Sequence, residues 1–509
     1  MNNSISRREF LKLAGLISAS LSLPKSYIPQ QFSGTNVGNQ NFLVIIYDAF
    51  SARHSSLYGY PRQTTPRLVE ISQKAIVYHN HYSGSNFTSP GVGSIFTGTL
   101  PWTHRAFKHN DRVAPEFEDK NLFHLFSNYN RMAYTHNPLV DTQIRQFRKD
   151  IEEYTPLADL YLANFQILAM LSGNDPDAFK MIWSRIMKER EGGYPYSLFL
   201  SNLYSAYLNK KIAPLRENFP RGLPYSFKDD YFALDDAIHW LQGHLTQAQQ
   251  PFFGYFHFLP PHSPYCTNQE YYHTFYKDGY RPTKKPKHLF TMGLSDHQLR
   301  DLREEYDEYI LYVDDTIEQI YRSLEKSGLT ENTWIVLTSD HGELFERGVS
   351  EHNTPLLYQS VIHVPLVIFE PGRKTRQDIH EYTSATDILP TMMHVSGQSI
   401  PDWTEGLVLP PFSSEIAVNQ RDLFALTARH TRQQSPITES TISLIKGQYK
   451  LIYYFGYKEL RDSKEQVEMY HLQDDPEELH NLYPQKKSLA EDMVAMIKTK
   501  LAEVNKPYL

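Results

Sequence analysis

The sequence predicts an α/β fold in which a mixed, mostly parallel sheet lies between layers of helices. Residues 42–47 (FLVIIY) and 334–338 (WIVLT) are continuous apolar runs rich in β-branched side chains, as expected for strands buried on both faces. Residues 306–326 have the apolar spacing of an amphipathic helix, and Gly328 follows as a stop signal. Strands and helices in this order favour a sheet that is covered on both faces.

The composition agrees with a globular chain. The 509 residues are 40% hydrophobic and 21% charged, which excludes a disordered or collagen-like chain. There are 51 basic and 58 acidic residues, for a net charge of −7, so we expect no nucleic-acid partner. The single cysteine, Cys266, excludes an internal disulfide and any cysteine-based metal cluster.

The first element is a targeting segment. Arg7 and Arg8 precede Phe-Leu-Lys and a short apolar run at residues 13–23, which resembles a twin-arginine export signal. The run is shorter than the ~20 residues that span a membrane. We therefore assign residues 1–35 to a twin-arginine signal peptide. We expect the twin-arginine machinery to export the protein to the periplasm or the medium, with no stable transmembrane segment elsewhere.

The strands that follow place chemically active side chains at one edge of the sheet. Residues 252–258 and 364–369 are two further candidate strands. Asp48 follows the strand at 42–47, and Asp340 and His341 follow the strand at 334–338. Ligands of open α/β sheets bind beyond the carboxyl ends of the strands, so this edge is the expected site.

Two regions differ from the strand–helix pattern. Residues 145–235 are helical in pattern and aromatic-rich, and we interpret them as a cap inserted into a catalytic domain at 41–397. Beyond it, short strands near 443–445 and 449–454 and an amphipathic helix at 488–504 predict a small α+β subdomain at 398–509.

A hydroxyl at a helix start completes a possible reaction centre. In residues 86–98 (NFTSPGVGSIFTG), Thr88 stands just before Pro90, a combination typical of helix N-termini. By itself such a pattern usually only caps a helix. Beside two carboxylates and an Asp-His pair, however, it indicates a metal-assisted nucleophile whose anionic target faces the N–H groups of the first turn.

A series of segments along the chain resembles the sulfatase family of the alkaline-phosphatase superfamily. The resemblance runs from residue 41 to 483 except in the cap, and it implies the family's fold, a mixed sheet between helices with a smaller C-terminal subdomain. The matching segments are residues 41–48, 57–68, 96–101, 261–265, 306–314, 338–343, 364–368, 386–391 and 469–482.

The resemblance implies a metal site and a nucleophile. Asp48, Asp340 and His341 stand where the family binds a divalent metal, and Thr88 stands where it keeps the nucleophile, which also contacts the metal. Imidazole favours zinc or manganese, whereas calcium prefers oxygen ligands. We therefore expect one divalent ion, zinc or manganese, with calcium as the alternative.

The resemblance also implies accessory roles. His262 stands where a family histidine contacts the oxyanion or assists the leaving group, although a histidine between prolines is often only structural. His352 stands near the position of a later active-site base or lysine. His104 and Asn110 lie where the family shapes its substrate-binding pocket.

The chain departs from the sulfatase pattern at its nucleophile. Sulfatases convert Cys or Ser to formylglycine within a Cys/Ser-x-Pro-x-Arg pattern, whereas this chain has Thr88 and, in place of the arginine, Val92. Ala49 and Pro260 replace two acidic residues of the family. Threonine cannot form the aldehyde, so its ester must be resolved by a second attack, which favours phosphorus over sulfur.

These observations predict an exported, metal-dependent hydrolase. We expect it to cleave a sulfate or phosphate ester of a small molecule or glycan, tilted toward phosphoesters such as phosphodiesters. Two alternatives stay open. One is a transferase that passes a phospho-substituent to a glycan or lipid, and the other is a non-catalytic relative that binds anionic glycans.

Overall fold

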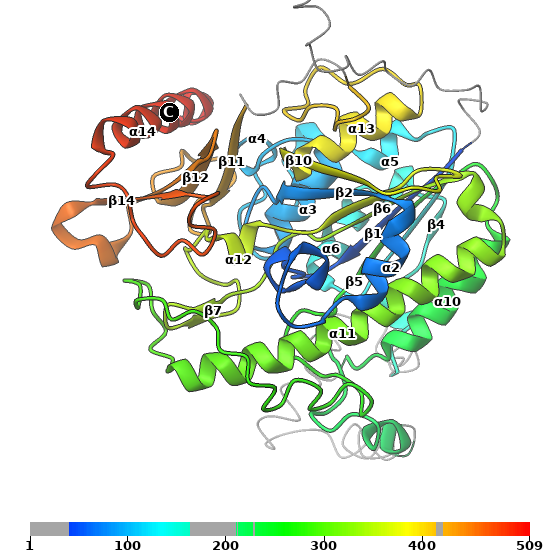
Figure 1. The fold of residues 1–509 in the computed structure, drawn as a ribbon. Coiled ribbons are helices and arrows are strands. Elements are labelled where there is room, and N and C mark those ends of the chain that lie inside the picture. Colours follow the sequence, from blue (N-terminus) through cyan, green and yellow to red (C-terminus); the bar gives the residue numbers. More distant parts are fainter. Residues whose placement is uncertain (1–39, 163–209, 211, 227–229, 414–420) are drawn as a thin grey trace, which may run out of the picture. The chain divides into compact units, whose positions relative to one another are not determined.

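The computed structural model describes residues 40–162, 210, 212–226, 230–413 and 421–509 (Figure 1). The predicted signal peptide at 1–35 and much of the predicted cap at 145–235 lie outside the described residues. Within the described part, no helix is long and apolar enough to cross a membrane.

A mixed, mostly parallel sheet of eight strands forms the centre of the fold, as the sequence predicts. Its order is β10-β2-β9-β6-β1-β5-β3-β4. β1 is central and pairs in parallel with β5 and β6, while β9 runs antiparallel to its neighbours β6 and β2. The strands are β1 (Asn41–Tyr47), β2 (Ile76–Tyr82), β3 (Asn130–Thr135), β4 (Glu153–Tyr154), β5 (Phe252–Phe258), β6 (Thr333–Thr338), β9 (Leu366–Phe369) and β10 (Gln377–Ser384).

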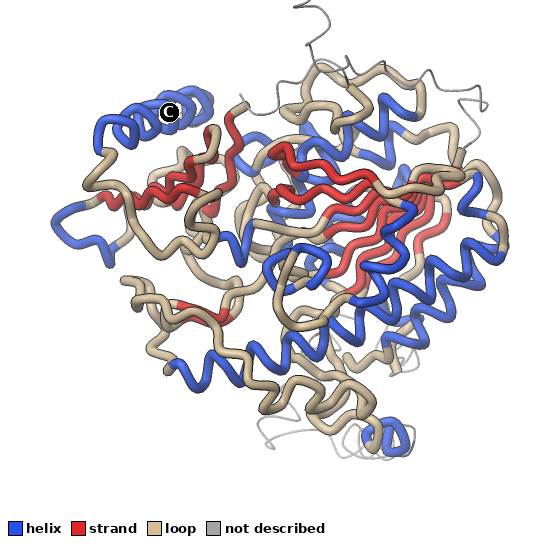
Figure 2. The backbone as a smooth tube through the Cα atoms, in the orientation of Figure 1, coloured by secondary structure: helices blue, strands red, loops and turns tan. Residues whose placement is uncertain are grey.

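Helices cover both faces of this sheet (Figures 1 and 2). The odd-numbered side chains of β1 pack into one apolar core with the helices of one face, and its even-numbered side chains pack into a second core with those of the other. This alternation explains why β1 is apolar throughout. One face carries α2 (Pro66–Ile71), α10 (Leu234–Gln247) and α11 (Asp296–Lys326), and the other carries α3 (Thr88–Thr97), α5 (Leu122–Leu125), α6 (Pro138–Gln146) and α13 (Ile388–Val395).

The long helix α11 begins earlier than the apolar pattern at 306–326 predicts. Ser295 caps it through a reciprocal capping box with Gln298, and the helix starts at Asp296. Its first turns are mostly exposed and polar, so they show little apolar periodicity. The end agrees better with the prediction, because Gly328 follows in a left-handed conformation with φ of 76°.

A separate antiparallel sheet forms the C-terminal part, in the order β11-β12-β13-β14. The predicted strands near 443–445 and 449–454 lie within β12 and β13, and the predicted helix at 488–504 is α14. The division between domains at 397 and 398 stays a prediction. The elements are β11 (Asp422–Thr427), β12 (Ser440–Lys446), β13 (Tyr449–Phe455), β14 (Glu465–His471) and α14 (Lys487–Asn505).

The C-terminal sheet is tied to the loop that leads into α3. The backbone N–H of Leu426 donates to the carbonyl of Gly84 at 2.9 Å, and Ser85 Oγ donates to the carbonyl of Leu426 at 2.7 Å. Leu100 and Trp102, around the short helix α4 (Pro101–His104), share an apolar core with the sheet and α14. These contacts hold the end of β11 beside the start of α3.

Candidate functional site

Polar side chains from three neighbouring parallel strands meet beyond the carboxyl ends of those strands. Asp48 follows β1, His257 is the penultimate residue of β5, and Asp340 and His341 come two and three residues after β6. Thr88 joins them from the start of α3. The four strand residues have no exposed surface, and Thr88 has almost none.

Asp48 is held by two donors on one of its oxygens. Asn137 Nδ2 donates to Oδ2 at 2.6 Å, and Nε2 of His257 lies 3.0 Å from the same oxygen. The other oxygen, Oδ1, has no hydrogen-bond partner and lies 3.4 Å from Nε2 of His341. Burial raises the pKa of Asp48, but the His257 hydrogen bond and the charges of nearby histidines outweigh it and lower the pKa to about 2.

Asp340 presents its free oxygen to the same space. Its Oδ1 accepts from the backbone N–H groups of His341 at 3.0 Å and Ala49 at 3.3 Å. Its Oδ2 is buried without a partner and lies 3.5 Å from Nε2 of His341. Burial and the charge of Asp48 raise the pKa of Asp340 to about 7. The charge of Asp48 is therefore close enough to disfavour the ionised form of Asp340.

The donor set fits a divalent cation. One ligand atom from each of Asp48, His257 and Asp340 can be chosen so that all lie within 4.8 Å of one another. A buried carboxylate oxygen without a partner is costly, and a cation would satisfy both Asp48 Oδ1 and Asp340 Oδ2. A buried Asp/His/Asp group that could hold a metal ion thus lies at the edge that the sequence predicts.

His341 turns a lone pair toward this group. Its Nδ1 lies 2.9 Å from the carbonyl oxygen of Gly342, to which it can only donate. This hydrogen bond assigns the proton to Nδ1 and leaves Nε2 free to bind a metal or accept a proton. Thr88 Oγ1 lies 3.3 Å from that Nε2.

His257 was not predicted from the sequence. In the aromatic strand FFGYFHF a single imidazole resembles an ordinary core residue, and β1 and β5 must be paired before Ile46 and His257 stand side by side. Its Nδ1 lies 3.1 Å from the hydroxyl of Tyr255, so both ring nitrogens have partners. The one available signal was a polar residue near the carboxyl end of an otherwise apolar strand.

The local sequence places Thr88 at the start of α3. Asn86, two residues earlier, donates through Nδ2 to the carbonyls of His352 at 3.0 Å and Thr354 at 2.6 Å, which anchors the approach to the helix. Gly91 lets the helix touch the metal site, because a Cβ there would lie 2.4 Å from the carbonyl oxygen of Asp340. The first turn of α3 therefore packs directly against the residues after β6.

His262 and His352 lie together beside His341. The ring centroids of His352 and His341 are 4.3 Å apart, and those of His352 and His262 are 4.8 Å apart. Nδ1 of His352 lies 3.0 Å from Oε1 of the buried Glu343, while Nδ1 of His262 donates to the carbonyl of Ser263 at 2.6 Å. The structure thus gathers both predicted accessory histidines at the site.

His104 lies elsewhere, and its placement does not support the predicted contact with substrate. Its Nε2 is 3.2 Å from Ser94 Oγ, and its Nδ1 accepts from the backbone N–H of Ala106 at 3.2 Å. A fully buried ring with both nitrogens engaged joins α3 to α4 and leaves no atom for a ligand. Asn110 is exposed on a turn with φ of 62°, and its substrate-binding role stays a prediction.

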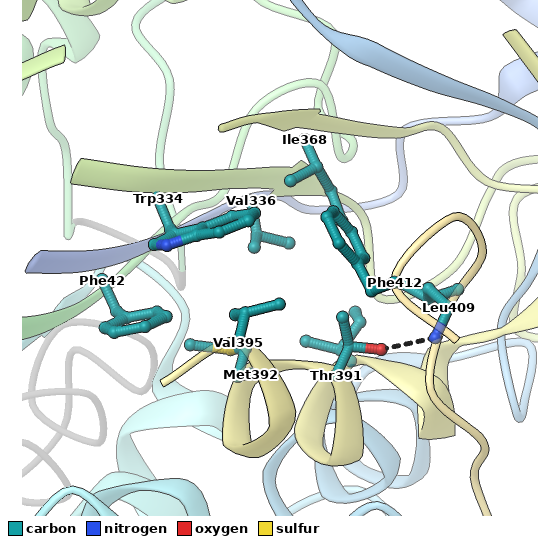
Figure 3. Close-up of a pocket in the computed structure, with 10 residues that line it drawn as sticks. Phe42, Trp334, Val336, Ile368, Thr391, Met392, Val395, Leu409 and Phe412 are labelled. Atoms are coloured by element: carbon teal, nitrogen blue, oxygen red, sulfur yellow. Dashed lines mark hydrogen bonds between the residues drawn. The ribbon is translucent and has the colours of Figure 1, made fainter. Parts of the chain in front are cut away.

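The gap drawn in Figure 3 is not part of this site. It lies between the sheet and α13 and is lined by apolar side chains, apart from Thr391, whose hydroxyl accepts from the backbone N–H of Leu409 at 2.8 Å. Phe42, on its wall, stands near the amino end of β1, whereas Asp48 follows the carboxyl end. The gap is a packing feature at the far end of the strands.

Comparison with known proteins shows the family of this chain. The model of the Sulfatase family matches residues 40–398. The chain belongs to the sulfatase family. A second model, "N-sulphoglucosamine sulphohydrolase, C-terminal", matches residues 351–507 and covers the C-terminal sheet.

Sulfatase-family relatives are similar at low identity. Arylsulfatase K of Canis lupus familiaris is 27% identical over 287 residues, covering 50% of this chain and 52% of that protein. The multifunctional alkaline phosphatase superfamily protein PehA of Trinickia caryophylli is 23% identical over 398 residues, covering 70% and 72%. The chain spans about half the length of the arylsulfatase K that it matches.

Solved sulfatase-like structures share the fold. A phosphonate monoester hydrolase of Agrobacterium radiobacter superposes with a TM-score of 0.62 at 18% identity, covering 92% of this chain and 96% of that one. A 2-O GAG sulfatase superposes with a TM-score of 0.64 at 16% identity, covering 92% and 93%.

α3 contributes no positively charged side chain to this site. Val92, which stands where the resemblance implies an arginine, is fully buried and packs in the apolar core between α3 and the sheet. The side chain therefore points away from any anion near Thr88. Any positively charged side chain at this site therefore comes from another element.

Proposed function

We propose that this protein is a metal-dependent hydrolase of sulfate or phosphate esters in which Thr88 is the nucleophile. One observation carries the proposal: Thr88 Oγ1, at the start of α3, lies 3.3 Å from Nε2 of His341. That nitrogen in turn faces the partnerless oxygens of Asp48 and Asp340. A hydroxyl, a helix N-terminus and a cation site thus share one buried space.

Asp48, Asp340 and His341 would hold the cation, with His257 against Asp48. When bound, a divalent ion supplies Lewis-acid stabilisation of anionic oxygens and lowers the pKa of a neighbouring hydroxyl. The imidazole groups favour zinc or manganese, and calcium is the alternative. The first-turn N–H groups of α3 face the charge that develops on the ester.

The reaction proceeds in two steps. Thr88 attacks as the alkoxide, so that its oxygen bonds to phosphorus or sulfur while the bond to the leaving-group oxygen breaks. His262 gives a proton to that oxygen through Nε2, the nitrogen that its bond to Ser263 leaves free. In the second step water attacks phosphorus or sulfur, the bond to the Thr88 oxygen breaks and regenerates the alkoxide, and the same nitrogen takes the proton of the water.

We further propose that phosphate esters, including diesters, are turned over faster than sulfate esters. A threonine ester cannot collapse to an aldehyde, so it must be cleaved by a second attack. PehA, a relative named as a multifunctional alkaline phosphatase superfamily protein, supports a broader ester chemistry for this chain. We also propose export through the twin-arginine pathway, on the basis of Arg7 and Arg8.

The test compares two adjacent hydroxyls. Thr88→Ala should lose nearly all turnover on a panel of sulfate and phosphate mono- and diesters while keeping its metal. Ser89→Ala is the matched control, because Ser89 Oγ is buried without a hydrogen-bond partner. Intact-mass analysis of quenched wild type should show an adduct at Thr88.

Three results would overturn these proposals. Activity that survives Thr88→Ala but is lost in Ser89→Ala would move the nucleophile. Faster turnover of sulfate esters than of phosphodiesters would end the tilt toward phosphorus. Transfer of the group to an added sugar or lipid in place of water would make the protein a transferase.

A further inference from the structure

A guanidinium group from the C-terminal sheet lies beside the start of α3. Arg429 comes two residues after β11, the strand whose Leu426 is hydrogen-bonded to Gly84 and Ser85. Its guanidinium carbon lies 4.5 Å from the ring centroid of Phe87, the residue that precedes Thr88. The docking of the two sheets therefore brings a positive charge to the nucleophile's neighbour.

The partners of Arg429 carry no negative charge. Nη2 lies 3.3 Å from Nε2 of His109 and donates to Oδ1 of Asn353. Nε is buried and has no hydrogen-bond partner. Among the described residues no carboxylate forms an ion pair with Arg429, and burial lowers the pKa of its guanidinium to about 10. A half-buried guanidinium without a counter-ion is costly, so an anionic ligand would complete this arrangement.

Arg429 also lies close to the reaction centre. It donates to Asn353, the neighbour of His352, whose ring centroid lies 4.3 Å from that of His341. His109 packs against Phe87, with ring centroids 5.4 Å apart, so it faces the same space. The position on α3 where the resemblance implies an arginine is the buried Val92. Arg429 thus offers from another element the charge that α3 lacks.

We propose that Arg429 is a specificity-determining residue that binds an anionic oxygen of the substrate, with His109 and Asn353 as positioning residues. The inference rests on the proposed function, since it names what the same site recognises. The oxygen belongs either to the reacting sulfate or phosphate group or to a second acidic group on the leaving group. Either acidic group can accept a pair of hydrogen bonds from the planar guanidinium group.

The test uses Arg429→Gln, Arg429→Lys and a matched control, Arg432→Gln. Arg432 is exposed and lies three residues further along the same loop. Two phosphate esters are compared, one with a neutral leaving group and one whose leaving group carries a carboxylate. Binding of inorganic phosphate and sulfate is measured by calorimetry on the metal-loaded protein. Circular dichroism checks the fold of each variant.

Loss of a charged hydrogen bond predicts a decrease of about 10- to 100-fold in Arg429→Gln. If Arg429 binds the reacting group, kcat/KM falls for both esters and inorganic phosphate or sulfate binds more weakly. If it binds a second acidic group, only the carboxylate-bearing ester is affected. Arg429→Lys keeps the charge but not the fork, so it should lie between wild type and Arg429→Gln. This variant keeps the test valid if Arg429→Gln does not fold.

The inference is overturned if Arg429→Gln matches Arg432→Gln in both kinetics and anion binding. Its failure is separable from failure of the proposed function. Wild type that hydrolyses no ester but binds inorganic phosphate through Arg429 would disprove the hydrolase and keep the anion site. Ester turnover that is unchanged in the Arg429 variants would keep the hydrolase and disprove the anion site.

Discussion

At the scale of single residues, the carboxylate of Asp48 is shared between two histidines. Nε2 of His257 lies 3.0 Å from one oxygen, and Nε2 of His341 lies 3.4 Å from the other. His341 directs its lone pair to the space between the carboxylates, whereas His257 also contacts the hydroxyl of Tyr255. We therefore expect His341 to bind the ion and His257 to orient Asp48.

The metal content of variants should distinguish a ligand of the ion from a residue that only orients a ligand. Asp340→Asn removes the charge of a ligand, so we expect a folded protein with little bound metal by elemental analysis. His257→Gln should retain metal, with an affinity lowered by about 10- to 100-fold, if His257 orients Asp48 rather than binding the ion. Asp296→Asn, at an exposed carboxylate paired with Lys284, is the control. Full metal occupancy in Asp340→Asn would contradict the assignment of the site.

The residues differ in how far the sequence reveals them. Asp48, Asp340 and His341 follow apolar runs, so local pattern and sheet logic suffice to find them. His257 sits inside such a run, and only strand pairing gives it a partner. Arg429 depends on the docking of a second sheet, which is a contact between distant parts of the chain. Contacts of that kind leave no local signal in the sequence.

At the scale of elements, α3 depends on a close approach to the loop after β6. Gly91 faces the carbonyl of Asp340, and a methyl group there would have to displace either the helix or the residues after β6.

The strands of the central sheet differ in how far the sequence predicts them. β1, β5, β6 and β9 are nearly continuous apolar runs and are predicted, whereas β2 and β10 carry polar side chains and are not. Their place at one side of the sheet explains that polarity.

A pair of glycine substitutions tests the close approach of α3 to the loop after β6. Gly91→Ala should lower the free energy of unfolding by about 1–3 kcal/mol through overpacking and reduce ester turnover by shifting Thr88. Gly243→Ala, within α10, meets no atom within 4 Å and should raise the free energy of unfolding by up to about 1 kcal/mol. Urea unfolding with a check for reversibility measures both. Equal stability of the two variants would refute the close approach.

At the scale of the whole molecule, the proposed export and the proposed chemistry depend on different parts of the chain. Residues 1–35 lie outside the described part, so the expectation rests on the sequence alone. The candidate site, in contrast, is described and draws its residues from the segment between the end of β1 and the loop after β11. Export and chemistry can therefore be tested on separate variants of the same full-length protein.

Replacing Arg7 and Arg8 together by lysine should leave the protein in the cytoplasm, because the twin-arginine pathway reads the pair itself. The net charge is unchanged by this substitution. Lys25→Gln, which alters the charge but keeps the pair, should be exported normally. Cell fractionation and immunoblotting measure both, and normal export of the double lysine variant would refute the signal.

The candidate site combines residues of the central sheet with Arg429, from the loop after β11. Asp48 and Asp340 follow strands of the central sheet, whereas the loop at residues 428–439 connects β11 and β12 of the C-terminal sheet. The apolar cores of that second sheet also include side chains from outside it, such as Trp102 and Leu357. The hydrogen-bond partners of the Asp48 and Asp340 carboxylates lie outside that loop. Substitutions confined to residues 428–439 should therefore change which esters the protein accepts while Asp48, Thr88 and Asp340 keep their positions. Relatives with different substrates can then arise through changes in this one loop.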